Sequence, residues 1–134
     1  MARAVWVAVE DLIFQAKILE TARQVGVPLW VVAPAKVQQA LTEDRPIAIL
    51  LDLNHGSAIK ALQGVKSDPV TRQVRVLGFL SHVDTELARS ARAAGCDTVL
   101  ARSAFSERLP QLLRELTTAA EPPDGFARKD GTRL

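Results

Sequence analysis

The chain has 134 residues, of which 48% are hydrophobic, and a formal charge of +2, so it is expected to form one domain and is not intrinsically disordered. Its single cysteine, Cys96, excludes an intrachain disulfide and favours a cytoplasmic setting. Interspersed acids and bases argue against a nucleic-acid partner, and no apolar run has the length of a targeting segment or a membrane span.

Short apolar runs recur along the chain, and most are rich in Val, Ile and Leu without alternating polar residues. Strands that are buried on both faces of a parallel sheet have this composition. Trp6 and Trp30 fall in the first two runs and are expected to be packing residues. The predicted strands cover residues 4–9, 27–33, 47–53, 74–80 and 98–101.

The segments between these runs have the spacing of amphipathic helices. In the first segment Leu12, Ala16 and Leu19 form an apolar stripe, and Gly26 is a candidate C-cap. In the last segment Ser106 as the N-cap would place Pro110 in the first helical turn, where a missing N–H costs little. The predicted helices cover about residues 12–25, 34–42, 57–66, 83–94 and 106–116.

Strands and helices thus alternate five times, which predicts an α/β fold built as a three-layer α/β/α sandwich. We expect a doubly wound, five-stranded parallel sheet with right-handed crossovers and the flavodoxin-like strand order 2-1-3-4-5. The domain is expected to span residues 1–117. The segment 118–134 contains Glu121-Pro-Pro-Asp-Gly and is otherwise polar, so it is expected to form a flexible C-terminal tail.

In such folds, ligands bind outside the carboxyl ends of the strands. Glu10 and Asp11 follow the first predicted strand, Asp52 ends the third, Ser81 follows the fourth and Arg102 follows the fifth. Clustered carboxylates repel one another unless a cation lies among them, and hard oxygen ligands favour Mg²⁺. A hydroxyl and a guanidinium opposite them could stabilise negative charge on a phosphoryl group.

Three stretches of the sequence resemble receiver domains of two-component response regulators, which are CheY-like proteins. They are residues 46–52, which end in Asp52, residues 66–76, and residues 93–97, which read Ala-Ala-Gly-Cys-Asp. The resemblance spans about residues 4–116. It implies that Asp52 accepts a phosphoryl group from a histidine kinase. It further implies that Mg²⁺ is held by Glu10, Asp11, Asp52 and the Asn54 carbonyl, and that Ser81 and Arg102 contact the phosphoryl group.

Several positions depart from the receiver pattern. Val9 precedes Glu10 where receivers have two adjacent acids, and the loop after Asp52 is shortened. The hydroxyl position of the family falls on Leu80 by count, or on Ser81 if the turn shifts by one residue, and its aromatic position in the fifth strand falls on Val99. Arg102-Ser replaces the Lys-Pro of the family, and arginine is bulkier and planar.

Two functions therefore remain open. The first is a single-domain response regulator in a phosphorelay, whose partner is a histidine kinase or a downstream effector. The second is a degenerate pseudo-receiver that acts as a phosphorylation-independent interaction module, or as a homodimer through the fourth helix, fifth strand and fifth helix. An enzyme is not expected, because the sequence has no glycine-rich nucleotide loop and no nucleophile–base pair.

Some of these residues also have structural interpretations. Asp11 is a candidate N-cap of the first helix, and Ser81-His-Val-Asp resembles a capping box before the fourth. His82 is expected to be an exposed loop residue, and Cys96 a packed small residue.

Overall fold

The computed structural model describes residues 3–81 and 85–120. All pairs of neighbouring strands are parallel, and their order in the sheet is β2-β1-β3-β4-β5. The α/β fold and the flavodoxin-like, CheY-like strand order predicted from the sequence are therefore confirmed. The strands are β1 (Val5–Ala8), β2 (Leu29–Val31), β3 (Ala48–Asp52), β4 (Arg75–Leu80) and β5 (Thr98–Ala101).

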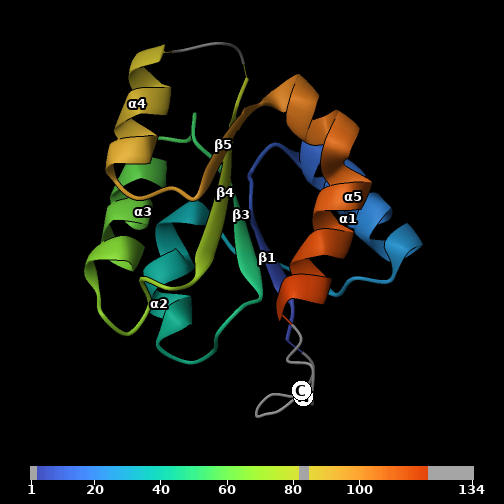
Figure 1. Ribbon diagram of the computed structural model, residues 1–134, viewed down its shortest axis with the longest axis horizontal. Helices are drawn as coiled ribbons and strands as arrows, with labels where there is room; N and C mark the ends of the chain where they lie inside the picture. Colours follow the sequence, from blue (N-terminus) through green and yellow to red (C-terminus); the bar gives the residue numbers. More distant parts are fainter. Residues whose placement is uncertain (1–2, 82–84, 121–134) are drawn as a thin grey trace.

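The helices cover both faces of the sheet and give the three expected layers (Figure 1). Helices α1 and α5 lie on one face, and α2, α3 and α4 lie on the other. Within the described residues, no helix is long and apolar enough to span a membrane. The helices are α1 (Leu12–Val25), a 3₁₀ turn η1 (Pro34–Lys36) that leads into α2 (Val37–Leu41), α3 (Ala58–Ser67), α4 (Thr85–Ala93) and α5 (Arg102–Ala120).

Two hydrophobic cores lie on the two faces of the sheet, because successive side chains of a strand point to opposite faces. In β1, Trp6 belongs to the core under α2, α3 and α4, whereas Val5 and Val7 belong to the core under α1 and α5. All residues of β1 and β3 are buried. This two-sided burial accounts for the unbroken apolar runs in the sequence.

The edge strand β2 departs from the prediction. Trp6 is buried, but Trp30, its partner in the register between β1 and β2, is 43% exposed. The expectation that Trp30 is a packing residue is therefore wrong. The physical reason is that β2 has three residues and a neighbour on one side only, so that the layers of helices do not enclose it.

Helix α1 ends as predicted, because Gly26 adopts the left-handed conformation (φ 76°) that glycine favours at a helix C-cap. Its buried face, however, differs from the predicted stripe. Phe14, Ile18 and Ala22 are buried, whereas Leu12 is 74% exposed. The spacing of the three buried residues is also helical, and it directs the phenylalanine into the core shared with α5.

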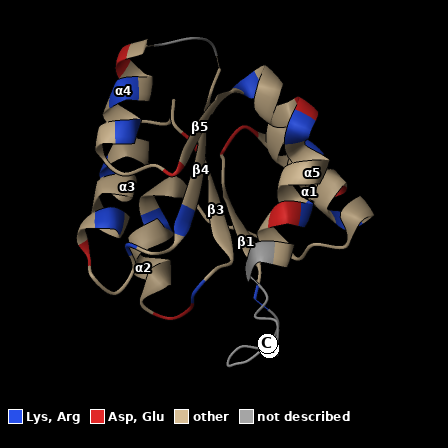
Figure 2. Ribbon diagram, in the orientation of Figure 1, with Lys and Arg blue, Asp and Glu red and all other residues tan. Residues whose placement is uncertain are grey.

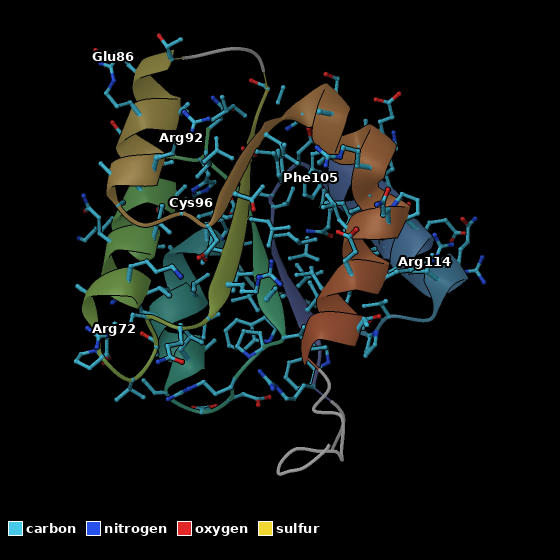
Figure 3. All side chains as sticks on the ribbon, in the orientation of Figure 1. Arg72, Glu86, Arg92, Cys96, Phe105 and Arg114 are labelled. Atoms are coloured by element: carbon cyan, nitrogen blue, oxygen red, sulfur yellow. The ribbon has the colours of Figure 1, made fainter. Side chains whose placement is uncertain are left out.

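Helix α5 begins at Arg102, directly after β5, and not at Ser106 as predicted. Pro110 is therefore inside the helix, where its missing N–H leaves the Ser106 carbonyl without a helical hydrogen bond. Burial compensates for this loss: Phe105 and Leu109 are completely buried against the sheet and α1, and Figure 3 shows Phe105 on that side of α5.

The same helix continues to Ala120, so residues 118–120 of the expected tail are helical. The rest of that segment, 121–134, lies outside the described residues.

Cys96 is a packed residue, as the sequence predicts. It is 8% exposed, and its single S–H has two acceptors within reach, the carbonyl oxygens of Val76 and Thr98, which lie 3.5 and 3.2 Å from Sγ. Burial raises the pKa of its thiol, which disfavours the reactive thiolate.

Candidate functional site

The carboxyl ends of the parallel strands bring three charged residues together, although they are far apart in the sequence. Asp52 is the last residue of β3 and is 9% exposed. Asp11 stands at the N-cap of α1, directly after β1, and Arg102 is the first residue of α5, directly after β5. We call these three residues the rim triad.

Arg102 connects the other two members of the rim triad. Its Nη1 lies 3.2 Å from Asp11 Oδ2, and its Nη2 lies 3.8 Å from Asp52 Oδ2. The guanidinium also lies over the ring of Phe14, 4.4 Å from the ring centroid, and 5.6 Å from that of Phe79. Such stacking favours a cation electrostatically. Ion pairs and aromatic rings together therefore fix the position of the guanidinium.

One atom of this arrangement lacks a partner. The Nε atom of Arg102 is buried and has no hydrogen-bond acceptor among the described residues. A buried donor without an acceptor is uncommon in proteins and carries a desolvation penalty. The buried Nε of Arg102 therefore lowers the stability of the folded protein.

Asp11 is the helix cap that the sequence allowed. Its Oδ1 accepts a hydrogen bond from Phe14 N at 3.1 Å. This bond and the hydrogen bond from Arg102 lower the pKa of the carboxyl below its ordinary value. Both oxygens of Asp11 are thus engaged by groups of the protein.

Glu10 pairs with His55, a residue that the sequence analysis did not select. The Nε2 atom of His55 lies 2.8 Å from Glu10 Oε1, and His55 Nδ1 accepts a hydrogen bond from Ser57 N at 3.0 Å. Because Nδ1 is the acceptor, the proton of the neutral ring is on Nε2 and points to the glutamate. The signal that could have identified His55 is its place in the loop that follows Asp52, at the same edge of the sheet.

Asn54 connects two loops of this edge. Its backbone N donates to Asp52 Oδ1 at 3.0 Å, and its side-chain Oδ1 accepts from Ser81 N at 2.6 Å. Ser81 is thus held beside the β3 loop through its backbone. The rest of the proposed capping segment, including His82, lies outside the described residues.

The three carboxylates among the four expected Mg²⁺ ligands do not gather into a metal site among the described residues. Within residues 3–81 and 85–120, no three acidic, histidine or cysteine side chains are placed to hold a metal ion together. Glu10 pairs with His55, and a fixed guanidinium lies next to both Asp11 and Asp52. A cation attracted by these carboxylates would meet the positive charge of Arg102, so the donor set does not fit Mg²⁺.

No protein-family model matches the sequence, and a search of curated proteins finds no match either. Solved structures, in contrast, match over most of the chain. A response regulator from Hahella chejuensis is 18% identical with a TM-score of 0.79, covering 90% of this chain and 98% of its own.

Two further matches were solved with a metal ion or in a phosphorylated form. The receiver domain of the sensor histidine kinase PA1611 from Pseudomonas aeruginosa, solved with magnesium in its active-site cleft, is 16% identical with a TM-score of 0.75. The match covers 88% of this chain and 99% of that one. The phosphorylated cyanobacterial phytochrome response regulator RcpA is 20% identical with a TM-score of 0.68, covering 87% and 91% of the two chains. At these identities the matches show that the chain has the receiver fold.

Proposed function

We propose that this chain is a receiver-fold signalling module that binds a protein partner without being phosphorylated. The observation that carries the proposal is the position of Arg102, whose guanidinium is fixed beside Asp11 and Asp52. The proposal assigns no catalytic activity to the chain. It corresponds to the pseudo-receiver alternative of the sequence analysis.

Phosphorylation of Asp52 would require a carboxylate oxygen that can attack and a cation that neutralises the transferred group. Oδ1 of Asp52 accepts from Asn54 N, and Oδ2 faces Arg102. The acids that could bind a metal beside it are engaged by His55 and Arg102. The guanidinium of Arg102 therefore holds the loops of this edge in one arrangement without an added metal ion.

One observation favours the competing function, a phosphoacceptor. Asp52 ends the central strand β3, and its side chain keeps 12% of its surface exposed at the edge where ligands of this fold bind. In this function Ser81 and Arg102 would contact the phosphoryl group, the metal would be Mg²⁺ and the partner would be a histidine kinase.

A chemical phosphorylation assay separates the two functions. We expect phosphoramidate with Mg²⁺ to add no phosphoryl group to the folded protein, measured as intact mass. Titration with Mg²⁺ should leave the NMR signals of residues near Asp52 unchanged. In Arg102→Ala the two aspartates lose their cation, so the same titration should shift these signals. A phosphoryl group that is added to the wild-type protein and is absent from Asp52→Ala would refute the proposal.

A further inference from the structure

The outer edge of β2 exposes two large apolar side chains, one on each face of the sheet. Trp30 is 43% exposed and Val31 is 47% exposed. Val32 packs against the core under α2, α3 and α4, and Leu29 packs against the core under α1 and α5. Because successive side chains alternate between the faces, Trp30 lies on the side of Val32, and Val31 lies on the side of Leu29. A docked helix would cover only one of these faces, whereas a strand added to the edge extends over both.

The same edge presents backbone hydrogen-bonding groups to an added strand. Val32 N donates to Val7 O, so the backbone groups of Val32 point toward β1. Backbone groups of successive residues point to opposite sides of a strand, so the N–H and C=O groups of Leu29 and Val31 point away from β1. In the part of the chain that the structure describes, β2 has a neighbouring strand on one side only. Four backbone groups are therefore available to a further strand.

The segment that contains β2 carries no charge that would prevent such pairing. Natural proteins commonly protect edge strands with charged side chains, lysine above all. Residues 24–35 include no Asp, Glu, Lys or Arg. Figure 2 shows the charged residues mainly on the helices and loops, whereas the labelled strands are almost entirely tan. Pro28 and Pro34 flank the strand and restrict any pairing to a short segment.

We propose that two copies of this chain pair through β2, antiparallel about a twofold axis at Trp30, so that the two sheets become one continuous sheet. In this register Trp30 lies opposite its own counterpart, and Leu29 lies opposite Val31 of the second copy. Directly opposite residues of an antiparallel pair exchange both backbone hydrogen bonds when their groups face each other. The four outward groups of one copy are thus all satisfied by the same four groups of the other.

Self-complementarity selects a second copy over a strand of another protein. Every side-chain pair in this register is apolar, with Trp30 against Trp30 on one face and Leu29 against Val31 on the other. The tryptophan pair takes the non-hydrogen-bonded position, where side chains approach most closely, and aromatic cross-strand pairs stabilise sheets. A twofold contact brings each patch against itself, which is favourable here because residues 24–35 are uncharged. The contact involves no residue of the rim triad, so it does not depend on the proposed function.

Analytical ultracentrifugation of the full chain tests the pairing. We expect a concentration-dependent equilibrium of monomer and dimer with a Kd of about 10–100 μM, because strands of three residues give a small contact. Trp30→Lys removes the central aromatic pair and places two ammonium groups opposite each other. The Kd of this variant should rise at least about tenfold.

Val70→Lys is the matched control, because it also replaces an exposed apolar side chain with lysine. Val70 is 67% exposed and precedes β4, which is separated from β2 by β1 and β3. This variant makes the same change in net charge and should dimerise as the wild type does. Thermal melts verify that each variant is folded.

A proline substitution tests the backbone hydrogen bonds. Val31→Pro removes an outward N–H and no hydrogen bond to β1, and proline is tolerated in an edge strand where the N–H faces solvent. We expect this variant to remain folded and to be monomeric. If it does not fold, Trp30→Lys still decides, because the Trp30 side chain is half-exposed.

Disulfide cross-linking in a glutathione redox buffer tests the register. In Trp30→Cys the two introduced cysteines face each other with Cα atoms about 4.5 Å apart, which a disulfide can bridge. In Val31→Cys they are diagonal neighbours, more than about 7 Å apart. We therefore expect Trp30→Cys to form covalent dimers and Val31→Cys to remain uncross-linked. The native Cys96 is buried, so wild-type protein is the blank.

Three results would overturn the inference. They are a wild-type protein that stays monomeric up to about 1 mM, equal effects of Trp30→Lys and Val70→Lys on the Kd, and equal cross-linking of Trp30→Cys and Val31→Cys. Phosphorylation of Asp52 would refute the proposed function and leave the dimer standing. A monomeric protein would refute the dimer and leave the proposed function standing.

Discussion

Two basic side chains with little solvent exposure lie at opposite ends of the strands, and each contacts at least one aspartate. At the amino ends of the strands, the Lys66 side chain is 12% exposed, and its Nζ donates to Arg72 O, Val74 O and Asp97 Oδ2 at 3.0, 2.7 and 2.9 Å. At the carboxyl ends, the Arg102 side chain is 29% exposed and has a buried Nε without an acceptor.

The two networks differ in how many of their hydrogen-bond donors have acceptors. An ammonium group has three donors, and all three of Lys66 have acceptors. Asp97 Oδ2 also accepts from Val76 N at 2.8 Å, so this network fastens β4 and the start of β5 to α3. The Arg102 network leaves a donor unpaired and holds a cation beside two acids. Such departures from full satisfaction are expected where a protein carries function.

Replacing Lys66 should have the largest effect on stability. In Lys66→Met the two carbonyls and the Asp97 carboxylate lose a charged donor. We expect the free energy of unfolding to fall by about 2–4 kcal/mol, measured by urea denaturation. Lys60→Met, which changes an exposed lysine of the same helix, should cost less than about 0.5 kcal/mol. Equal losses in the two variants would show that the Lys66 network does not stabilise the fold.

Replacing Arg102 with methionine should lower the free energy of unfolding less than Lys66→Met does. Arg102→Met removes the unpaired Nε together with the charge, and the thioether can still pack on the Phe14 ring. We expect a loss of about 1 kcal/mol or less in the same denaturation experiment. A loss as large as that of Lys66→Met would contradict the contrast between the two networks.

The smallest effect should appear in the pH dependence of stability. Folding lowers the pKa of Asp11, so its ionised form stabilises the folded state at pH values above the ordinary aspartate pKa of about 3.9. This stability is lost as the pH falls through the lowered pKa. The difference in unfolding free energy between the wild type and Asp11→Asn should therefore shrink below about pH 4. A difference that is constant from pH 3 to pH 6 would contradict this assignment.

Much of the fold could be predicted from the sequence, because it depends on local patterns. Apolar runs, helical spacing and the Gly26 stop are properties of short segments, and the parallel order follows from their alternation. The start of α5 could not be predicted from a capping rule. The burial of Phe105 and Leu109 outweighs the preference of Pro110 for a first turn, and burial depends on the neighbouring α1 and β4.

The same division holds for the candidate site. The strand ends alone predicted that Glu10, Asp11, Asp52, Ser81 and Arg102 lie at one edge of the sheet, because each directly follows an apolar run. The pairings at that edge could not be predicted, since several acids and bases lie within reach of one another. His55 pairs with Glu10, and Arg102 pairs with Asp11 and faces Asp52.

The sequence by itself thus determined the layers, the strand order and which residues gather at the carboxyl edge, because hydrophobic periodicity and topology are encoded locally. Only the tertiary structure decided which acidic and basic side chains pair at that edge. The guanidinium of Arg102 is held by the rings of Phe14 and Phe79, which come from α1 and β4. That stacking joins residues far apart in the chain, and it places a fixed positive charge among the carboxylates.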